Sequence, residues 1–296
     1  MSLTTDEDSA PTPPQLFAPR RRRLLVGRRG LVVSALSSVI VLLVIFAIFW
    51  LAPGGPTFRS FFFNPHDMWQ AFVGNPTKGL LSVGRGLVTN IWMFLLSEVL
   101  VLILGLVIAT VRLSQSPVLF PFRALATIYV DVMRGVPIVL VMYMIGFGLP
   151  ELNLGFLSNQ SPAVYGCATL TLSYSAYVAE VYRAGVLSVP HGQLLAARSL
   201  GLTHTATMRR VILPQAVRNV IPPLLNDFIS MQKDTALVSL LGAVEATRAA
   251  QIYGDTVFNF SGFTVAAILF LLLTIPMTRF TDHLIARDRN RRLAAT

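Results

Sequence analysis

The fold class of this chain follows from LVTNIWMFLLSEVLVLILGLVIATV, residues Leu87–Val111. This stretch contains one ionisable side chain, Glu98. It is also longer than the about 20 residues that a helix needs to cross the hydrocarbon core of a bilayer. The stretch therefore predicts a transmembrane helix.

Four other segments reach membrane length: Leu31–Ala52, Ala124–Leu149, Ala163–Leu187 and Phe263–Phe280. The first is too long for a signal-peptide core and has no A-x-A cleavage pattern. Gln215–Leu241 is less apolar, since it also holds Pro222, Pro223, Asn226, Asp227, Gln232, Lys233 and Asp234. We count it as a span because broken, polar helices are tolerated where they line a cavity enclosed by protein. These segments predict an all-α membrane protein with six transmembrane helices.

The composition agrees with this class. The chain is 54% hydrophobic and 13% charged, whereas soluble domains carry about 25% charged residues. Its net charge of +10 would suit a nucleic-acid-binding protein, but arginines in cytoplasmic loops of a membrane protein account for it equally. The apolar runs favour the second explanation, and we expect no nucleic-acid partner.

Six spans place both termini on one side of the membrane, and the positive-inside rule predicts that this side is cytoplasmic. It carries most of the basic residues: Arg20–Arg23, Arg28, Arg29, Arg112, Arg123, Arg198, Arg209, Arg210, Arg218, Arg287, Arg289, Arg291 and Arg292. The outer side carries Arg59, Lys78, Arg85 and Arg248. If Gln215–Leu241 were not a span, Arg287–Arg292 would lie on the outer side of the membrane, against the positive-inside rule. The distribution of basic residues therefore supports six spans.

The chain divides into five predicted parts. Residues 1–30 are a disordered, basic N-terminal tail, and 31–52 are an N-terminal helix outside the core. Residues 53–86 are an external loop whose aromatic side chains, Phe61–Phe63, Trp69 and Phe72, suit the membrane interface. Residues 87–287 form the core, and 288–296 a basic C-terminal tail. The core includes the longest inner connection, 188–214.

Neither a metal site nor a phosphate-binding loop is indicated. Cys167 is the single cysteine, and His66, His191, His204 and His283 lie far apart without ligand spacing. The sequence has no G-x-x-x-x-G-K-[ST] motif, and its only lysines are Lys78 and Lys233. The chain is therefore not expected to bind or hydrolyse ATP by itself.

The inner connection carries the most informative pattern, PHGQLLAARSLG at residues 190–201. Good helix formers precede Gly201, which can end a helix. A second short segment, Thr203 to Ile212, is expected to end at Leu213-Pro214. Such a helical hairpin is suited to docking another protein, and the alternative is a solvated connecting loop.

This pattern resembles the EAA loop of bacterial ABC importer permeases, in which Glu-Ala-Ala precedes a glycine and Ile-x-Leu-Pro. Further matches resemble the polar amino-acid uptake branch, and they lie in Arg134-Gly135-Val136-Pro137, Ala176–Glu180 with Arg183, Pro222 with Asn226, and Lys233-Asp234-Thr235. The resemblance covers roughly Leu80 to Arg287. It implies the five-helix core of a type I importer, to which Leu31–Ala52 adds one helix.

The resemblance also implies partners and coupling residues. The residues that would couple the chain to an ATPase are Gly192, Gln193, Leu195, Ala196, Ala197, Arg198, Gly201, Leu213 and Pro214. Leu195 replaces the glutamate of the motif, so an acid–base contact is not available there. The implied partners are two ABC ATPase subunits that bind Mg-ATP, a second permease subunit and an extracytoplasmic amino-acid-binding protein. All would meet at a bacterial cell membrane, where lipids surround the spans.

Charged residues inside spans are costly and are functional candidates. Asp131/Arg134 and Glu180/Arg183 are spaced i,i+3, which predicts two structural ion pairs. The candidates for a substrate path are Asn219, Asn226, Asp227, Glu180 and Glu98. Pro222-Pro223 should disturb the helix that carries the first three, and freed carbonyls could then help to bind an ammonium group. Hydrogen bonding between helices is the alternative role.

Two other functions compete with amino-acid import. One is a permease for another small polar solute, since the loop motif occurs across many importers. The other is an intramembrane enzyme that uses Asp131, Glu180 or Asp227, for which the sequence has no G-x-S-x-G or H-E-x-x-H signature.

Overall fold

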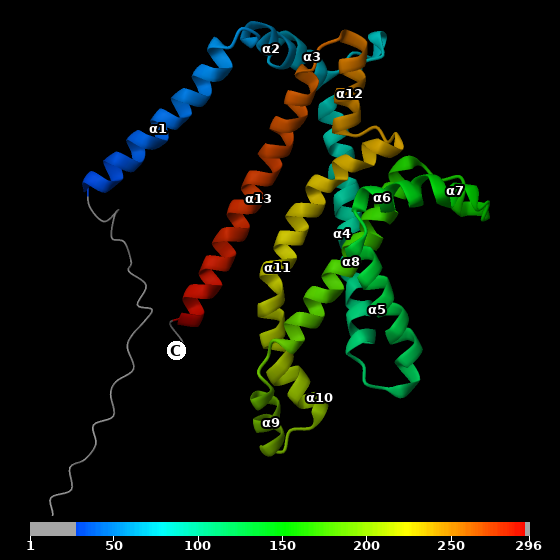
Figure 1. The fold of residues 1–296 in the computed structure, drawn as a ribbon. Helices are drawn as coiled ribbons and strands as arrows, with labels where there is room; N and C mark the ends of the chain where they lie inside the picture. The colour runs from blue at the N-terminus through cyan, green and yellow to red at the C-terminus, as the bar shows by residue number, and fades with distance from the viewer. Residues whose placement is uncertain (1–27, 294–296) are drawn as a thin grey trace, which may run out of the picture. The chain divides into compact units, whose positions relative to one another are not determined.

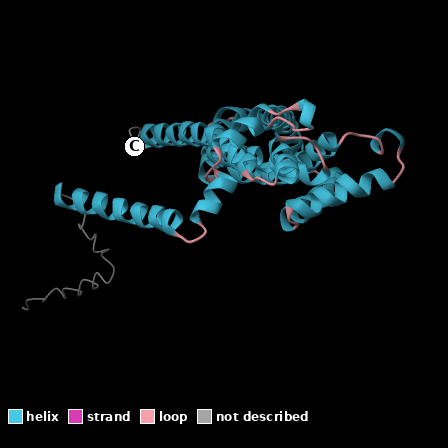
Figure 2. Cartoon of the chain, turned by 90° about the horizontal axis from the view of Figure 1, so that it is seen from above, coloured by secondary structure: helices cyan, strands magenta, loops and turns pink. Residues whose placement is uncertain are grey.

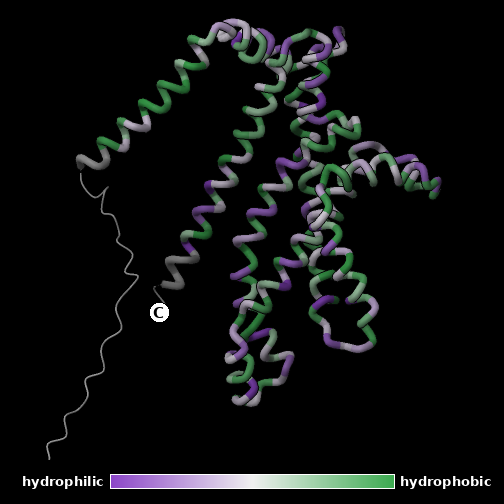
Figure 3. Tube along the Cα trace, in the orientation of Figure 1, coloured by the Kyte–Doolittle hydropathy of each residue, from purple (hydrophilic) through white to green (hydrophobic). Residues whose placement is uncertain are grey.

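The computed structural model describes residues 28–293, and it divides the chain into two compact units, Met1–Thr57 and Phe58–Thr296. The first contains α1 (Arg28–Leu51), a helix made mostly of hydrophobic residues, as Figure 3 shows. Such a helix suits a lipid environment. The predicted tail 1–30 lies largely outside the described residues. Within the predicted basic tail 288–296, helix α13 continues as far as Leu293.

Every named element of the described part is a helix, which confirms the all-α class (Figure 2). Four long helices form the second unit: α4 (Val83–Leu113), α8 (Pro162–Leu187), α11 (Leu213–Asp234) and α13 (Ser261–Leu293). The shorter helices are α2 (Gly55–Phe62), α3 (Pro65–Val73), η1 (Pro76–Lys78), η2 (Pro117–Leu119), α5 (Phe120–Gly135), α6 (Ile138–Tyr143), η3 (Met144–Gly148), α7 (Leu149–Glu151), η4 (Gly155–Leu157), α9 (His191–Ser199), α10 (His204–Thr207), η5 (Met208–Ile212), η6 (Thr235–Leu241) and α12 (Ala246–Val257).

Length and composition select α4 and α13 as helices that can cross a membrane. The bent pair Pro117–Gly135 and Ile138–Glu151 would make a third span, and Val32–Ile48 is a shorter apolar helix. Helices α8 and α11 are more polar than α4 (Figure 3). The protein is therefore a multi-pass membrane protein, while the count of six spans and the cytoplasmic termini stay predictions.

The predicted span Ala124–Leu149 is not one straight helix, because the chain bends by 110° between Gly135 and Ile138. Val136 is extended, with φ −95° and ψ 131°. A residue before proline is driven out of the helical region by contact with the proline ring, and Pro137 supplies that ring here. The break leaves the end of α5 and the start of α6 facing a groove.

Two predictions about α11 are wrong. The helix continues through Pro222 and Pro223 without a break. The second loop helix does not end at Leu213-Pro214 but continues through η5 into α11. Since η5 is a turn of π-helix, in which the Leu213 amide donates to the Met208 carbonyl, the wider turn leaves room for a proline ring that an α-helix would exclude.

The segment 53–86, predicted as an external loop, contains α2, α3 and η1. The Phe260 amide donates to the Phe61 carbonyl over 2.8 Å, and the Asn64 amide donates to Ser261 Oγ over 3.1 Å. Tyr253, which is fully buried, donates its hydroxyl proton to Asp67 over 2.8 Å. These bonds hold α3 against α12 and α13. The predicted interfacial aromatics Phe61, Phe63, Trp69 and Phe72 remain exposed on this layer.

Helices α4 and α8 pack against each other in the core, and Gly105 lies where they meet. A Cβ atom at Gly105 would lie 2.7 Å from Val178 Cγ1 and 3.3 Å from the Ala179 amide nitrogen. Small residues at such crossings let helix backbones approach closely in membrane proteins. This packing fixes α8, which provides one wall of the groove at the α5–α6 break.

Candidate functional site

Two adjoining cavities of about 440 and 380 Å³ line a groove between α5, α6, α8 and α11. Arg134, Tyr177 and Asp227 line both cavities. The first cavity also contains Asp234 and the backbone of the helix break, and the second contains Glu180 and Asn219. Four charged side chains of the predicted spans, Arg134, Glu180, Asp227 and Asp234, therefore line this one place.

Arg134 lies in the last turn of α5, and its guanidinium carbon is 5.8 Å from the centre of the Tyr177 ring. This is a cation–π contact between α5 and α8. The predicted ion pair of Arg134 with Asp131 does not form, and Asp131 is exposed. The prediction failed because an i,i+3 spacing identifies neighbours on one helix but not an aromatic ring supplied by another helix.

Asp227 projects from α11 into the same groove. Its Oδ2 atom is buried and has no hydrogen-bond partner. Arg134 is near enough for the two charges to attract each other, but the described residues contain no direct ion pair between them. A buried, unpaired carboxylate oxygen is costly and is a position where a cationic ligand would be stabilised.

Asp234 and Tyr174 extend the polar wall of the first cavity. The Tyr174 hydroxyl donates to Asp234 Oδ2 over 2.8 Å, which joins α8 to the end of α11. Tyr174 is buried, and it belongs to the apolar cluster at the centre of the second unit. The hydrogen bond therefore holds Asp234 against a rigid part of the molecule.

Glu180 is neutralised by two arginines. Arg183 Nε donates to its Oε2 atom over 3.1 Å, which matches the predicted i,i+3 pair. Arg112, at the end of α4, donates to the same oxygen over 2.7 Å. Sequence reasoning missed this second partner, for which the only signal was a basic residue at the end of the span Leu87–Val111. With both arginines in place, the structure favours a structural role for Glu180.

The remaining candidates for the substrate path differ in whether they line the cavities. Asn219 lines the second cavity and donates to Ser188 Oγ over 2.8 Å. Asn226 is exposed and is outside both cavities. Glu98 is half-buried on α4, also outside both, but close enough to Asp227 for their charges to repel. Asp227 is therefore the candidate that the geometry favours most.

The inner loop contains the second group of candidate residues, on α9. One face of α9 packs on the chain itself, since Ala197 is buried and Leu194 contacts the cluster of Val189, Ile212 and Ala216. Gln193 accepts a hydrogen bond from Gln215 at the start of α11. The other predicted loop residues are exposed, and they are Gly192, Leu195, Ala196, Arg198, Gly201, Leu213 and Pro214.

A Schellman motif ends α9 and fixes the direction of the loop. The Leu202 amide donates to the Ala197 carbonyl over 3.2 Å, and the Gly201 amide donates to the Arg198 carbonyl over 2.9 Å. Gly201 has φ +82°, a conformation that glycine adopts without steric cost. Thr203 then caps α10 by accepting from the Ala206 amide.

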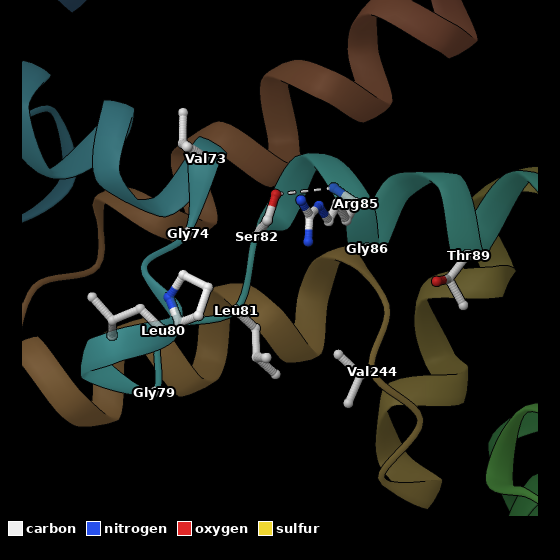
Figure 4. Close-up of a pocket in the computed structure, with 11 residues that line it drawn as sticks. Val73, Gly74, Gly79, Leu80, Leu81, Ser82, Arg85, Gly86, Thr89 and Val244 are labelled. Carbon is white, nitrogen blue, oxygen red and sulfur yellow. Dashed lines mark hydrogen bonds between the residues drawn. The ribbon is translucent and has the colours of Figure 1, made fainter.

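A further cavity of about 410 Å³ lies at the N-terminal end of α4 (Figure 4). Arg85 is its only charged lining residue, and the Arg85 amide donates to Ser82 Oγ over 3.1 Å. This cavity contains no acidic side chain, whereas the groove between α5, α6, α8 and α11 contains both acidic and basic side chains. Among the described residues, no three His, Cys, Asp or Glu side chains gather as metal ligands would.

Comparison with known proteins gives consistent results. Residues 101–290 match the family described as "Binding-protein-dependent transport system inner membrane component". The "Probable glutamine ABC transporter permease protein GlnM" of Bacillus subtilis (strain 168) is 34% identical, over 62% of this chain and 82% of the relative. The "Arginine transport system permease protein ArtQ" of the same organism is 33% identical, over 66% and 86%.

A solved structure, described as "Crystal structure of an amino acid ABC transporter with histidines", superposes with a TM-score of 0.64 and 33% sequence identity. The superposition covers 69% of this chain and 93% of the other. The matched part of the sequence includes the groove and the inner loop.

Proposed function

Because the chain belongs to the binding-protein-dependent transport system inner membrane components, and within them to the amino-acid ABC transporter permeases, we propose that it forms the membrane passage of an ATP-driven amino-acid importer in a bacterial cell membrane. The amino acid passes through the groove between α5, α8 and α11. One observation carries this proposal: Arg134 and Asp227, whose Oδ2 atom is buried without a hydrogen-bond partner, line the same cavities without pairing directly with each other.

Such a groove complements a zwitterion. The Arg134 guanidinium can bind the α-carboxylate of an amino acid through two parallel hydrogen bonds, which lysine cannot do. Asp227 can accept hydrogen bonds from the α-ammonium group, which would give its buried oxygen a partner. The cavities, of about 440 and 380 Å³, lie in the usual size range of small-molecule sites.

ATP hydrolysis takes place in partner subunits under this proposal. Two ABC ATPase subunits, which hold Mg-ATP, dock on α9 and α10 of two permease chains. A second permease subunit, either a copy of this chain or a relative, completes the passage, and an extracytoplasmic binding protein delivers the amino acid. Nucleotide binding then shifts the spans between two arrangements, since the ATPases bind one of them more tightly.

The names of the relatives do not settle the amino acid, because one is named for glutamine and the other for arginine. The test therefore uses the full set of labelled amino acids, in proteoliposomes that contain the complete complex and its binding protein. Uptake of another small polar solute in place of every amino acid would support the alternative permease function.

The site is tested with Asp227→Asn, which keeps the shape of the side chain and removes its charge. We expect uptake to fall by at least about tenfold, which corresponds to the loss of one charged contact. Complex yield and basal ATP hydrolysis should be retained. Asp131→Asn is the matched control, because Asp131 is exposed and outside both cavities. Normal uptake by Asp227→Asn, or a failure of that complex to assemble, would contradict the role of Asp227.

A further inference from the structure

The end of α11 is attached to α4 by a buried asparagine. Asn90 of α4 is 1% exposed and lines neither cavity of the groove. Its Nδ2 atom donates to Thr235 Oγ1 over 3.1 Å and to Glu245 Oε2 over 3.0 Å, while its Oδ1 atom accepts from the Ala246 amide over 3.1 Å. The side chain therefore makes three of the four hydrogen bonds that an amide group can make.

Helix α12 fixes the orientation of Asn90. It lies beside the N-terminal part of α4 (Figure 1). A Cβ atom at Gly86, one turn before Asn90, would lie 2.5 Å from the Ala246 amide nitrogen, so the glycine lets the start of α12 come this close. Oδ1 of Asn90 faces a backbone donor and Nδ2 faces the Glu245 carboxylate. Only one orientation of the amide satisfies both partners.

Thr235 connects Asn90 to the groove. It is the first residue of η6 and directly follows Asp234, the last residue of α11. The helix changes here from α to 3₁₀, and the rotation from one residue to the next changes with it. The Thr235 hydroxyl donates to the Gln232 carbonyl over 2.7 Å and accepts from Asn90. This hydroxyl therefore ties the junction of the two helices to α4, and the direction of the Asp234 side chain depends on that junction.

The carboxylate of Asp234 has one oxygen available to a ligand. Asp234 lines the first cavity together with Arg134 and Asp227. Its Oδ2 atom accepts from the Tyr174 hydroxyl, whereas its Oδ1 atom has no hydrogen-bond partner among the described residues. Oδ1 can therefore accept a hydrogen bond from an amino acid in the cavity. A shift of about 1 Å in a contacting group is enough to weaken such a contact strongly.

Stability alone does not explain the polar cluster at this junction. Gln232 is 1% exposed and accepts from Thr274 Oγ1 over 2.9 Å, but its Nε2 atom is buried without a partner in the part of the chain that the structure describes. An apolar side chain of similar size would avoid this cost. The cluster therefore fits a place where the direction of the chain matters more than its stability.

We propose that Asn90 is a positioning residue of the transport site: through Thr235 it holds the Asp234 carboxylate at the wall of the first cavity, where Oδ1 binds the amino acid. This inference rests on the proposed function, which supplies the amino acid. It adds a second carboxylate contact beside Asp227, and a residue of α4 that acts on the site without lining it.

Thr235→Val tests the proposal, because valine keeps the shape of the side chain and removes the hydroxyl. Uptake of the labelled amino acid that the parent imports fastest is measured in proteoliposomes, per assembled complex and with saturating binding protein. We expect uptake to fall about three- to tenfold, which corresponds to the loss of one hydrogen bond. Thr235→Ser, which keeps the hydroxyl, should transport like the parent.

Thr169→Val is the matched control for removing a buried hydroxyl. Thr169 is fully buried, lines neither cavity, and donates its hydroxyl proton to the Tyr165 carbonyl of its own helix. We expect normal uptake per assembled complex from this variant. A loss as large as that of Thr235→Val would mean that any buried hydroxyl has this effect, which would overturn the inference.

A double-mutant cycle separates positioning from packing. If Thr235 acts through Asp234, adding Thr235→Val to Asp234→Asn should lower uptake no further, because the charge that it positions is already gone. Losses that multiply in the double variant would overturn the inference, as would normal uptake by either single variant. Asn90→Ala repeats the test from the other side of the hydrogen bond, and the same pattern is expected. If neither Thr235→Val nor Asn90→Ala assembles, the bond serves assembly, and the inference fails as well.

The same measurements separate this inference from the proposed function. A parent complex that imports no amino acid contradicts the proposed function. If the parent imports an amino acid and Thr235→Val imports it equally well, only the positioning role of Asn90 and Thr235 fails.

Discussion

Arg112 Nη1 donates to Glu180 Oε2 over 2.7 Å and so joins the end of α4 to α8. The side chains are 11% and 21% exposed, which makes this a largely buried ion pair. Arg183 binds the same carboxylate. One acidic group therefore holds two guanidinium groups at the second cavity of the groove.

Glu180→Gln should destabilise the protein more than Arg112→Gln does. The first change leaves two partly buried arginines without their carboxylate, whereas the second leaves Glu180 paired with Arg183. We expect losses of about 3 and about 1 kcal/mol respectively, from the cost of breaking buried pairs and hydrogen bonds. Thermal unfolding of the complex in detergent measures both. Equal losses would mean that Arg183 alone does not hold the carboxylate.

Gly105→Ala should separate α4 from α8. The added methyl group would lie 2.7 Å from Val178 Cγ1, so the helices have to move apart, at a cost of about 1–3 kcal/mol. Gly148→Ala is the control, because a Cβ there meets nothing within 4 Å and its φ is −79°. Unfolding curves of the two variants give the comparison. Similar midpoints for both would show that the crossing tolerates a side chain.

Glu245 should make stability depend on pH. It is fully buried, and its carboxylate accepts hydrogen bonds from Asn90 Nδ2 and from the Thr247 and Arg248 amides. Burial raises the pKa of Glu245 above its ordinary value of 4.5 despite these bonds. The folded state therefore holds a proton that the unfolded state releases, and this contribution to stability is lost as pH rises above about 4.5 through the folded pKa.

Glu245→Gln should remove that slope. The amide has one acceptor oxygen for three donors, so we expect the variant to be about 1 kcal/mol less stable than the parent at pH values where Glu245 is protonated. The difference between parent and variant should shrink as pH rises from 4.5. Unfolding midpoints measured along a pH series test this prediction. A difference that stays constant with pH would exclude Glu245 as the titrating group.

A chain that starts at Phe58 should retain transport if it inserts correctly, because the second unit begins there. A chain that starts at Trp69 should not. It lacks Phe61, Asn64 and Asp67, whose hydrogen bonds tie this segment to α12 and α13. Uptake and the yield of folded complex, measured for both truncations, test the prediction. Full activity from the shorter chain would show that the outer layer is dispensable.

The helical class and the family could be predicted from the sequence alone, since both depend on local information. The predicted span Ala163–Leu187 agrees with α8 within one residue, because the hydrogen bonds of a helix join neighbours in the chain. The inner-loop motif, with the scattered matches in the spans, identified the family that the comparisons confirm. Whether a proline interrupts a helix was harder to predict from the sequence. Pro137 coincides with a break, whereas Pro222 and Pro223 lie inside a continuous helix.

The partners of the charged side chains were decided by the tertiary structure. Spacing along one helix predicted Glu180 with Arg183, but it could not predict Arg112, which comes from α4. It also paired Arg134 with Asp131, whereas the packing of α5 on α8 places the Tyr177 ring beside Arg134. In the same way, the loop motif did not separate Ala197, which faces inward, from Leu195, which faces solvent. A helix allows each side chain several neighbours, and only the packing of the other helices determines which of them it meets.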